Sequence, residues 1–88
     1  MNREKPSIGD TVIHFKHEIE TDEPKVKFTY RITGFAMHTE TEETLVIYRS
    51  CWTGDYYARP IDMFMSEVDR EKYPNVEPKY RFEKVDAV

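Results

Sequence analysis

Cysteine is nearly absent from this chain, which has one, Cys51, among 88 residues. One thiol cannot form a disulfide within the chain, so the disulfide-stapled scaffolds common among small secreted domains are excluded. No apolar run approaches the roughly 18 residues of a membrane-spanning helix. The segment Met1–Pro6 lacks the apolar stretch of a signal peptide. These features predict a cytoplasmic location.

Basic residues are outnumbered: 13 Lys and Arg stand against 17 Asp and Glu, a net charge of −4. Non-specific nucleic-acid binding depends on many contacts between basic side chains and phosphates, so the overall field opposes it. Attraction to anionic membranes is disfavoured for the same reason. The chain has six Tyr, five Phe and one Trp, and we expect these aromatic side chains to fill much of the hydrophobic core. We expect one domain over residues 9–86, preceded by a flexible N-terminus over residues 1–8.

Short segments rich in β-branched and aromatic residues predict about five strands, at 11–17, 26–38, 45–52, 56–59 and 80–85. Polar segments at 18–24 and 39–43 predict surface loops, and a turn is expected at 53–55. In the first strand, alternation predicts Thr11, Ile13 and Phe15 on one face and His14 and Lys16 on the other.

Two local signals refine this pattern. Gly34 lies where one face of the second strand changes from polar to apolar, which predicts a bulge or a tight bend. Pro60 begins a short helix, whose two-turn apolar stripe is Ile61, Phe64, Met65 and Val68. The predicted fold class is mostly β: a small, strongly curved antiparallel SH3-like barrel of about five strands, with one short helix before the last strand.

Several motifs occur in a set order along the chain: His14-Phe15-Lys16-His17, Tyr30-x-Ile32-x-Gly34-x-Ala36-x-His38-Thr39-Glu40-Thr41-x-Glu43, Leu45-Val46-Ile47-Tyr48-Arg49, Gly54-Asp55 and Arg59-Pro60-x-Asp62-Met63-Phe64. Their order and most spacings resemble the uncharacterised bacterial family known as domain of unknown function 1653. The resemblance covers about residues 9–68, and weakly Tyr80-Arg81-Phe82. It implies a small stand-alone bacterial domain and carries no activity. The acidic stretch Glu18–Lys25 departs from the short Gly-containing turn usual in the family.

Aromatic residues gather around the Gly54 turn, and two arginines lie in the adjoining apolar strands. Tyrosine and tryptophan are favoured where one end of a site is apolar and the other is wet. Arg49 and Arg59 have two interpretations. Each guanidinium could brace the turn against Asp55, Asp62 or backbone carbonyls. Alternatively, one could face a cleft and hold a carboxylate or phosphate. The candidate ligand-binding residues are Tyr48, Arg49, Trp52, Asp55, Tyr57 and Arg59.

His14 and His38 form a second candidate site, because histidine can titrate near neutral pH or bind a metal. Neither has a recognisable ligand spacing, and the ring of His38 could simply bond loop backbone. Cys51 could pair with a histidine as a nucleophile, but a lone cysteine on an apolar strand is more often a small core residue. No phosphate loop or nucleophile-elbow motif is present. The sequence therefore predicts no catalytic residue, metal or cofactor.

The leading hypothesis is a non-enzymatic binding module with an aromatic–arginine groove, whose partner is an unknown protein, a peptide or a small anionic ligand. The alternative is a small enzyme or enzyme subunit that uses His14 or His38 with a nearby Asp. Sequence-tolerant RNA binding is a third possibility, and it needs a positive face built from Lys16, Lys25, Lys27 and Arg31. The last strand could pair with a second copy, so we expect a monomer or weak homodimer.

Overall fold

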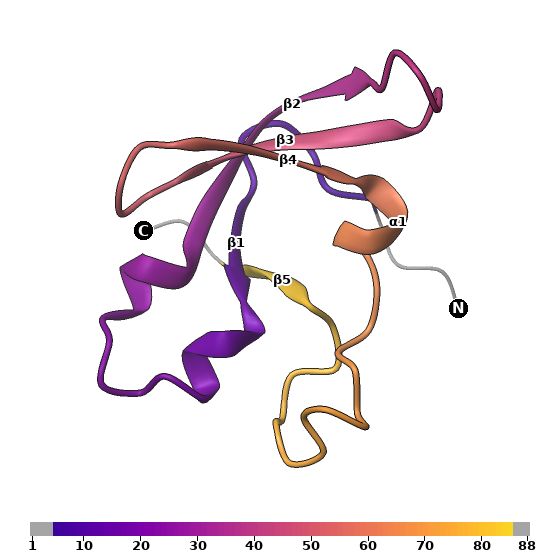
Figure 1. Cartoon of the computed structure of the whole chain (residues 1–88). Helices are drawn as coiled ribbons and strands as arrows, with labels where there is room; N and C mark the ends of the chain where they lie inside the picture. The colour runs from indigo at the N-terminus through magenta and orange to yellow at the C-terminus, as the bar shows by residue number, and fades with distance from the viewer. Residues whose placement is uncertain (1–4, 86–88) are drawn as a thin grey trace.

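A five-stranded antiparallel sheet organises the chain, in the order β4-β3-β2-β1-β5 (Figure 1). The computed structural model describes residues 5–85, so part of the predicted flexible segment (1–4) and the predicted domain end at residue 86 lie outside the described residues. The strands are β1 (Thr11–His14), β2 (Thr29–Met37), β3 (Thr44–Ser50), β4 (Tyr56–Pro60) and β5 (Phe82–Val85). The other elements are the 3-10 helices η1 (Phe15–Glu18) and η2 (Lys25–Phe28) and the short helix α1 (Ile61–Phe64). The predicted mostly-β class with one short helix is confirmed.

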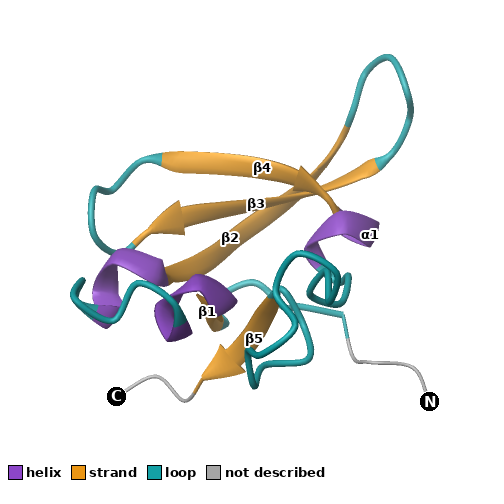
Figure 2. Cartoon of the chain, turned by 60° about the horizontal axis from the view of Figure 1, so that its bottom comes forward, coloured by secondary structure: helices purple, strands orange, loops and turns teal. Residues whose placement is uncertain are grey.

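The sheet is open, so the predicted strongly curved SH3-like barrel is not confirmed. Strands β4 and β5 end the sheet on opposite sides and do not pair with each other (Figure 2). Closure would bring their backbones to about 4.8 Å. Side chains occupy this space instead: the Tyr48 ring lies 5.5 Å from the Phe82 ring, and the Arg59 guanidinium lies 5.7 Å from the same ring.

Strand β1 ends three residues earlier than predicted, because the chain turns into η1 after His14. Nδ1 of His14 accepts a hydrogen bond from the Lys16 N–H at 3.2 Å, as a helix cap does. Within the strand the predicted faces are confirmed, with Thr11 and Ile13 on one side and His14 on the other, but Phe15 belongs to η1 and does not continue this alternation. Val12 is buried and Ile13 is only partly buried, whereas Phe15 reaches the core because η1 turns it inward.

Strand β2 begins at Thr29, since the 3-10 helix η2 replaces the first residues of the predicted 26–38 strand. Its pairing with β3 shifts register between Ile32 and Gly34, so the strand is irregular where a bulge or a tight bend was predicted. The loops at 18–24 and 39–43 are exposed, as predicted. Strand β5 lies at the sheet edge, next to β1.

Helix α1 has a single turn, which is shorter than the predicted two-turn stripe. The Ser66 hydroxyl donates to the Met63 carbonyl at 2.6 Å, and the Val68 N–H bonds the Lys79 carbonyl at 2.9 Å, so the chain leaves the helix. Phe64 stacks on Phe82, with ring centroids 4.3 Å apart. The buried core cluster is Val12, Ile32, Val46, Tyr48, Phe64 and Phe82. Between residues 5 and 85 no helix has the length and apolar character to cross a membrane.

Candidate functional site

Two adjoining hollows share a wall made of His14, Lys16 and Arg59. The first, which we call the aromatic hollow, has a volume of about 270 Å³ and is also lined by Phe28, Tyr30, Tyr48, Tyr57 and Phe82. The second, which we call the basic hollow, has a volume of about 290 Å³ and is also lined by Phe15, Asp69, Lys72, Tyr73 and Arg81.

Sheet register explains why these side chains meet. Residues directly opposite each other in an antiparallel pair project to the same face. Tyr48 pairs with Tyr57, and the buried Val46 pairs with Arg59, so Tyr57 and Arg59 project from β4 toward the core face. His14 pairs with Phe82 at the other end of the sheet. The aromatic hollow therefore lies between β4 and the pair formed by β1 and β5.

His14 is held in one orientation by its neighbours. Its ring stacks on Phe15 at 4.7 Å and meets Phe82 edge-on at 4.9 Å. Because Nδ1 accepts the Lys16 N–H, the proton of the neutral ring lies on Nε2. Nε2 has no protein partner in the described part of the chain. The ring can therefore offer an N–H donor to a molecule in the hollows.

The surroundings of His14 favour its neutral form. Burial lowers the pKa of His14 from 6.5 to about 4, and the positive charges of Arg59, Lys16, Arg81 and His17 act in the same direction. The imidazole is therefore uncharged at pH 7. A negative charge placed at the shared wall would offset the neighbouring positive charges and so raise this pKa.

Arg59 reaches the shared wall from β4. Its Nε donates a long hydrogen bond, 3.4 Å, to the Tyr48 hydroxyl, and its guanidinium lies over the Phe82 ring. Within residues 5–85 no carboxylate pairs with Arg59, and its two terminal nitrogens have no hydrogen-bond partner. The turn-bracing interpretation therefore does not describe Arg59, whose fork of donors is available to a ligand.

Arg81 belongs to the basic hollow, and our sequence interpretation did not include it among the candidate residues. Its backbone is anchored on both sides, since its N–H bonds the Ser66 carbonyl at 2.9 Å and its carbonyl accepts the Phe15 N–H at 3.0 Å. Its Nε is buried and lacks a hydrogen-bond partner among the described residues. Such a donor is costly to leave unpaired. The only signal in the sequence was a lone arginine between Tyr80 and Phe82.

The two hollows concentrate positive charge in an acidic chain. Their lining includes four basic side chains and one carboxylate, Asp69. An oxygen of Asp69 already accepts the Glu71 N–H at 3.0 Å. Among the residues that the structure describes, the salt bridges join Lys27 to Glu20 and Glu23, and Lys84 to Asp10, so none neutralises the hollows.

Three tyrosines form the walls of the aromatic hollow. Tyr30 meets Tyr48 edge-on at 5.3 Å and Tyr57 edge-on at 6.1 Å. Burial raises the pKa of Tyr30, so its hydroxyl stays protonated. Tyr48 is buried, while Tyr57 is 44% exposed and lies at the mouth. The hollow therefore combines apolar ring surfaces with tyrosine hydroxyl groups.

The remaining candidate residues lie elsewhere. Arg49 donates from Nε to the Gly54 carbonyl at 3.0 Å and lies over the Tyr56 ring, so it braces the turn. Trp52 and Asp55 are exposed and line neither hollow. The structure thus brings together Tyr48, Tyr57 and Arg59 with His14, and it separates them from Arg49, Trp52 and Asp55.

His38 and Cys51 also lie outside the hollows. Nδ1 of His38 accepts the N–H groups of Glu40 and Thr41 at 3.2 and 3.3 Å, which is the loop-bonding role considered from the sequence. Cys51 is exposed, so the interpretation as a core residue is wrong. It lies just after β3, where the chain turns and no longer alternates between buried and exposed faces.

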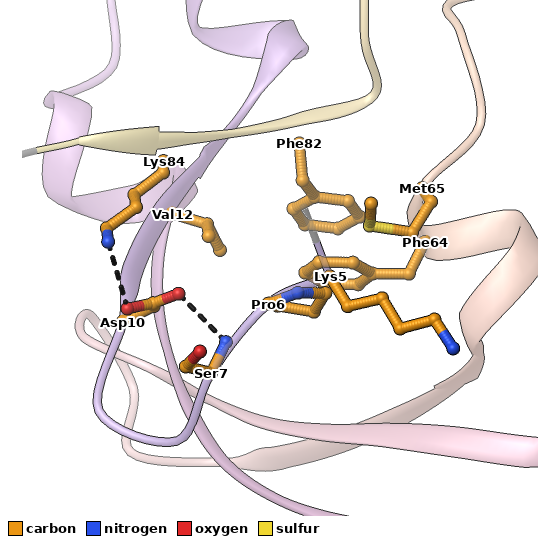
Figure 3. Close-up of a pocket in the computed structure, with 9 residues that line it drawn as sticks. All are labelled: Lys5, Pro6, Ser7, Asp10, Val12, Phe64, Met65, Phe82 and Lys84. Atoms are coloured by element: carbon orange, nitrogen blue, oxygen red, sulfur yellow. Dashed lines mark hydrogen bonds and ion pairs between the residues drawn. The ribbon is translucent and has the colours of Figure 1, made fainter. Parts of the chain in front are cut away.

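A smaller hollow of about 160 Å³ lies beside α1 (Figure 3). Phe64, Phe82 and Val12 supply its apolar surface, with Lys5 and Lys84 among its polar residues. Its carboxylate, Asp10, pairs with Lys84 at 3.3 Å and accepts the Ser7 N–H at 2.9 Å. These bonds satisfy Asp10 internally, so this hollow offers less unpaired charge than the other two.

The chain is thus a small, mostly-β domain with an open antiparallel sheet and a basic, tyrosine-lined pair of hollows on one face. The model of the family described as "Protein of unknown function (DUF1653)" matches residues 11–84. The chain belongs to this family, which confirms the resemblance seen in its motifs. No curated protein and no solved structure matches the chain.

Proposed function

We propose that the domain is a small non-enzymatic binding module that captures an anionic ligand in the aromatic and basic hollows. The observation that carries this proposal is the convergence of Lys16, Arg59 and Arg81 around His14, with no carboxylate paired to any of the three within residues 5–85. The proposed site still combines aromatic and arginine side chains, as the sequence predicted. It lies on the core face of the sheet and not at the turn that contains Trp52.

The chemistry of the site supports an anion. Guanidinium groups present parallel N–H donors that match the oxygens of a carboxylate or phosphate. The neutral His14 ring adds a donor at Nε2, and the partly buried setting strengthens electrostatic attraction relative to water. An anion in the basic hollow would also lie beside the positive charge of Arg81, which lines that hollow.

The alternative of a histidine-centred enzyme has less support. General acid–base catalysis by a histidine usually involves a third group that orients the ring, most often a carboxylate. The orienting partner of His14 is the backbone N–H of Lys16, and that of His38 is loop backbone. Sequence-tolerant RNA binding is also weakened, because Lys27 of the required positive face is paired with Glu20 and Glu23.

Amide NMR of the labelled chain, titrated with inorganic phosphate and with acetate at pH 7, tests the proposal. We expect shifts at His14, Lys16, Arg59 and Arg81. Arg59→Gln should weaken binding by about ten-fold or more, since it removes charge-assisted hydrogen bonds. Arg31→Gln is the control, because it removes the same charge from an exposed position on the opposite face of β2.

Two outcomes would contradict the proposal. Shifts centred on Trp52 to Asp55 would return the site to the turn. Equal weakening by Arg59→Gln and Arg31→Gln would show that the anions sense only the overall charge of the domain.

A further inference from the structure

The shared wall allows one ligand to occupy both hollows. We propose that the ligand is a phosphate ester that carries a flat ring, with its phosphate at His14, Lys16 and Arg59 and its ring in the aromatic hollow. This inference rests on the proposed function and names the class of ligand. Each hollow, at about 270 and 290 Å³, is close to the lower end of the roughly 300–1,000 Å³ range of ligand sites. A short ligand that spans the wall fits this arrangement.

The charge of the site favours phosphate over carboxylate. Among the described residues, Lys16, Arg59, Lys72 and Arg81 line the hollows with one carboxylate, Asp69, so positive charge is in clear excess there. A carboxylate carries a single negative charge, whereas a phosphate monoester carries about −1.5 to −2 at pH 7 and has three strong acceptor oxygens. Three donor nitrogens that have no partner among the described residues match that number of acceptors: Nε2 of His14 and the two terminal nitrogens of Arg59.

The aromatic hollow indicates what the ligand carries besides its phosphate. Its walls are the rings of Tyr30, Tyr48 and Tyr57, and Phe82 extends them toward the shared wall. Flat rings pack on aromatic side chains through offset-stacked or edge-to-face contacts. Tyr57 is the most exposed of the three tyrosines, so its ring is the wall that a ligand could cover from solvent.

The experiment uses the full chain and four matched probes: phenyl phosphate, inorganic phosphate, benzoate and phenol. Dissociation constants come from NMR shifts at Lys16 and His14. We expect phenyl phosphate to bind about five-fold or more tightly than inorganic phosphate, because stacking on an aromatic ring contributes at least that much. Benzoate should bind more weakly than phenyl phosphate, and phenol should cause no shift at His14.

A pair of neighbouring tyrosines supplies the matched control. Tyr57 projects into the hollow, whereas Tyr56 projects from the opposite face of β4. Tyr57→Leu should remove the advantage of phenyl phosphate over inorganic phosphate, and Tyr56→Leu should retain it. If Tyr57→Leu fails to fold, the comparison of probes on the unmodified chain still decides the question. Adenosine 5′-monophosphate, tested in the same way, distinguishes a ring attached through a sugar from one attached directly.

The outcomes separate the two proposals. If phenyl phosphate and inorganic phosphate bind equally and Arg59→Gln weakens both, the anion site stands and the ring is overturned. If benzoate binds as tightly as phenyl phosphate, the assignment to phosphate is overturned. If no probe shifts His14 or Lys16, both the inference and the proposed function fail.

Discussion

The imidazole of His14 and the backbone of Lys16 are joined by a hydrogen bond of 3.2 Å, from the Lys16 N–H to Nδ1. This bond caps η1, so it ends β1 and turns Phe15 into the core. It also assigns the proton of the neutral ring to Nε2, the atom left for a ligand. One local contact therefore shapes the fold and prepares the candidate site.

His14 should titrate well below the usual range of histidine. Its pKa should lie near 4, with the neutral ring protonated on Nε2. Arg59→Gln should raise this pKa while leaving it below 6.5, because burial is the larger cause of the shift and the charge of Arg59 is the second. Nitrogen-15 NMR of the ring across pH 3 to 8 measures both effects. A pKa near 6.5 in the unmodified chain would show that water reaches the ring freely.

Stability should depend on pH through the same residue. The unfolded ring titrates near 6.5 and the folded ring near 4, so between these values the unfolded chain binds a proton that the folded chain excludes. The free energy of unfolding should therefore fall as the pH drops from about 6.5 to 4. His14→Asn retains a capping acceptor but cannot titrate. Urea unfolding at pH 7 and pH 4 should show a smaller loss in this variant. Equal losses would contradict the prediction.

The stacked pair Phe64 and Phe82 should carry a large share of the stability. Phe64→Ala should reduce the free energy of unfolding by about 3–5 kcal/mol, since it removes a side chain that is 2% exposed. Met63→Ala, at a side chain that is 49% exposed, should change it by about 0.5 kcal/mol or less. Urea denaturation of both variants tests this. A loss below about 1 kcal/mol for Phe64→Ala would mean that the core closes around the cavity.

The turn before β4 should require glycine at position 54. Gly54 has φ +80°, and an added Cβ would lie 3.0 Å from Nη2 of Arg49. Gly54→Ala should therefore lower the free energy of unfolding by about 1–2 kcal/mol. Gly34→Ala is the control, since a Cβ added there would meet nothing within 4 Å and its φ is not positive. Thermal unfolding of the two variants should differ clearly. Similar melting temperatures would show that the turn adjusts without strain.

The exposed position of Cys51 predicts rapid modification. One thiol per chain should react with a disulfide reagent such as DTNB in the absence of denaturant. The absorbance of the thiolate that DTNB releases should be the same in native buffer and in urea. A thiol that reacts only after unfolding would place Cys51 in the core, as its strand-like surroundings had suggested.

Local patterns in the sequence were sufficient for much of the fold. Short runs of β-branched and aromatic residues located all five strands approximately, and Gly34 marked the irregularity in β2, because both signals reside within a few consecutive residues. The limits of β1 and α1 were harder to predict. Each is set by a side chain that bonds nearby backbone, His14 in one case and Ser66 in the other, and such bonds compete with regular structure.

The candidate site shows where sequence patterns stop being informative. Composition and motifs identified two tyrosines, two arginines, Trp52, Asp55 and two histidines as the residues of interest, since their chemistry is independent of the fold. Which of them meet depends on strand register: Arg59 lies opposite the buried Val46 and faces the hollow, whereas Arg49 lies opposite Tyr56 on the outer face. Arg81 joins them from a distant segment. A register shift of one residue exchanges the two faces of a strand, so only the tertiary structure could decide which arginine faces the hollow.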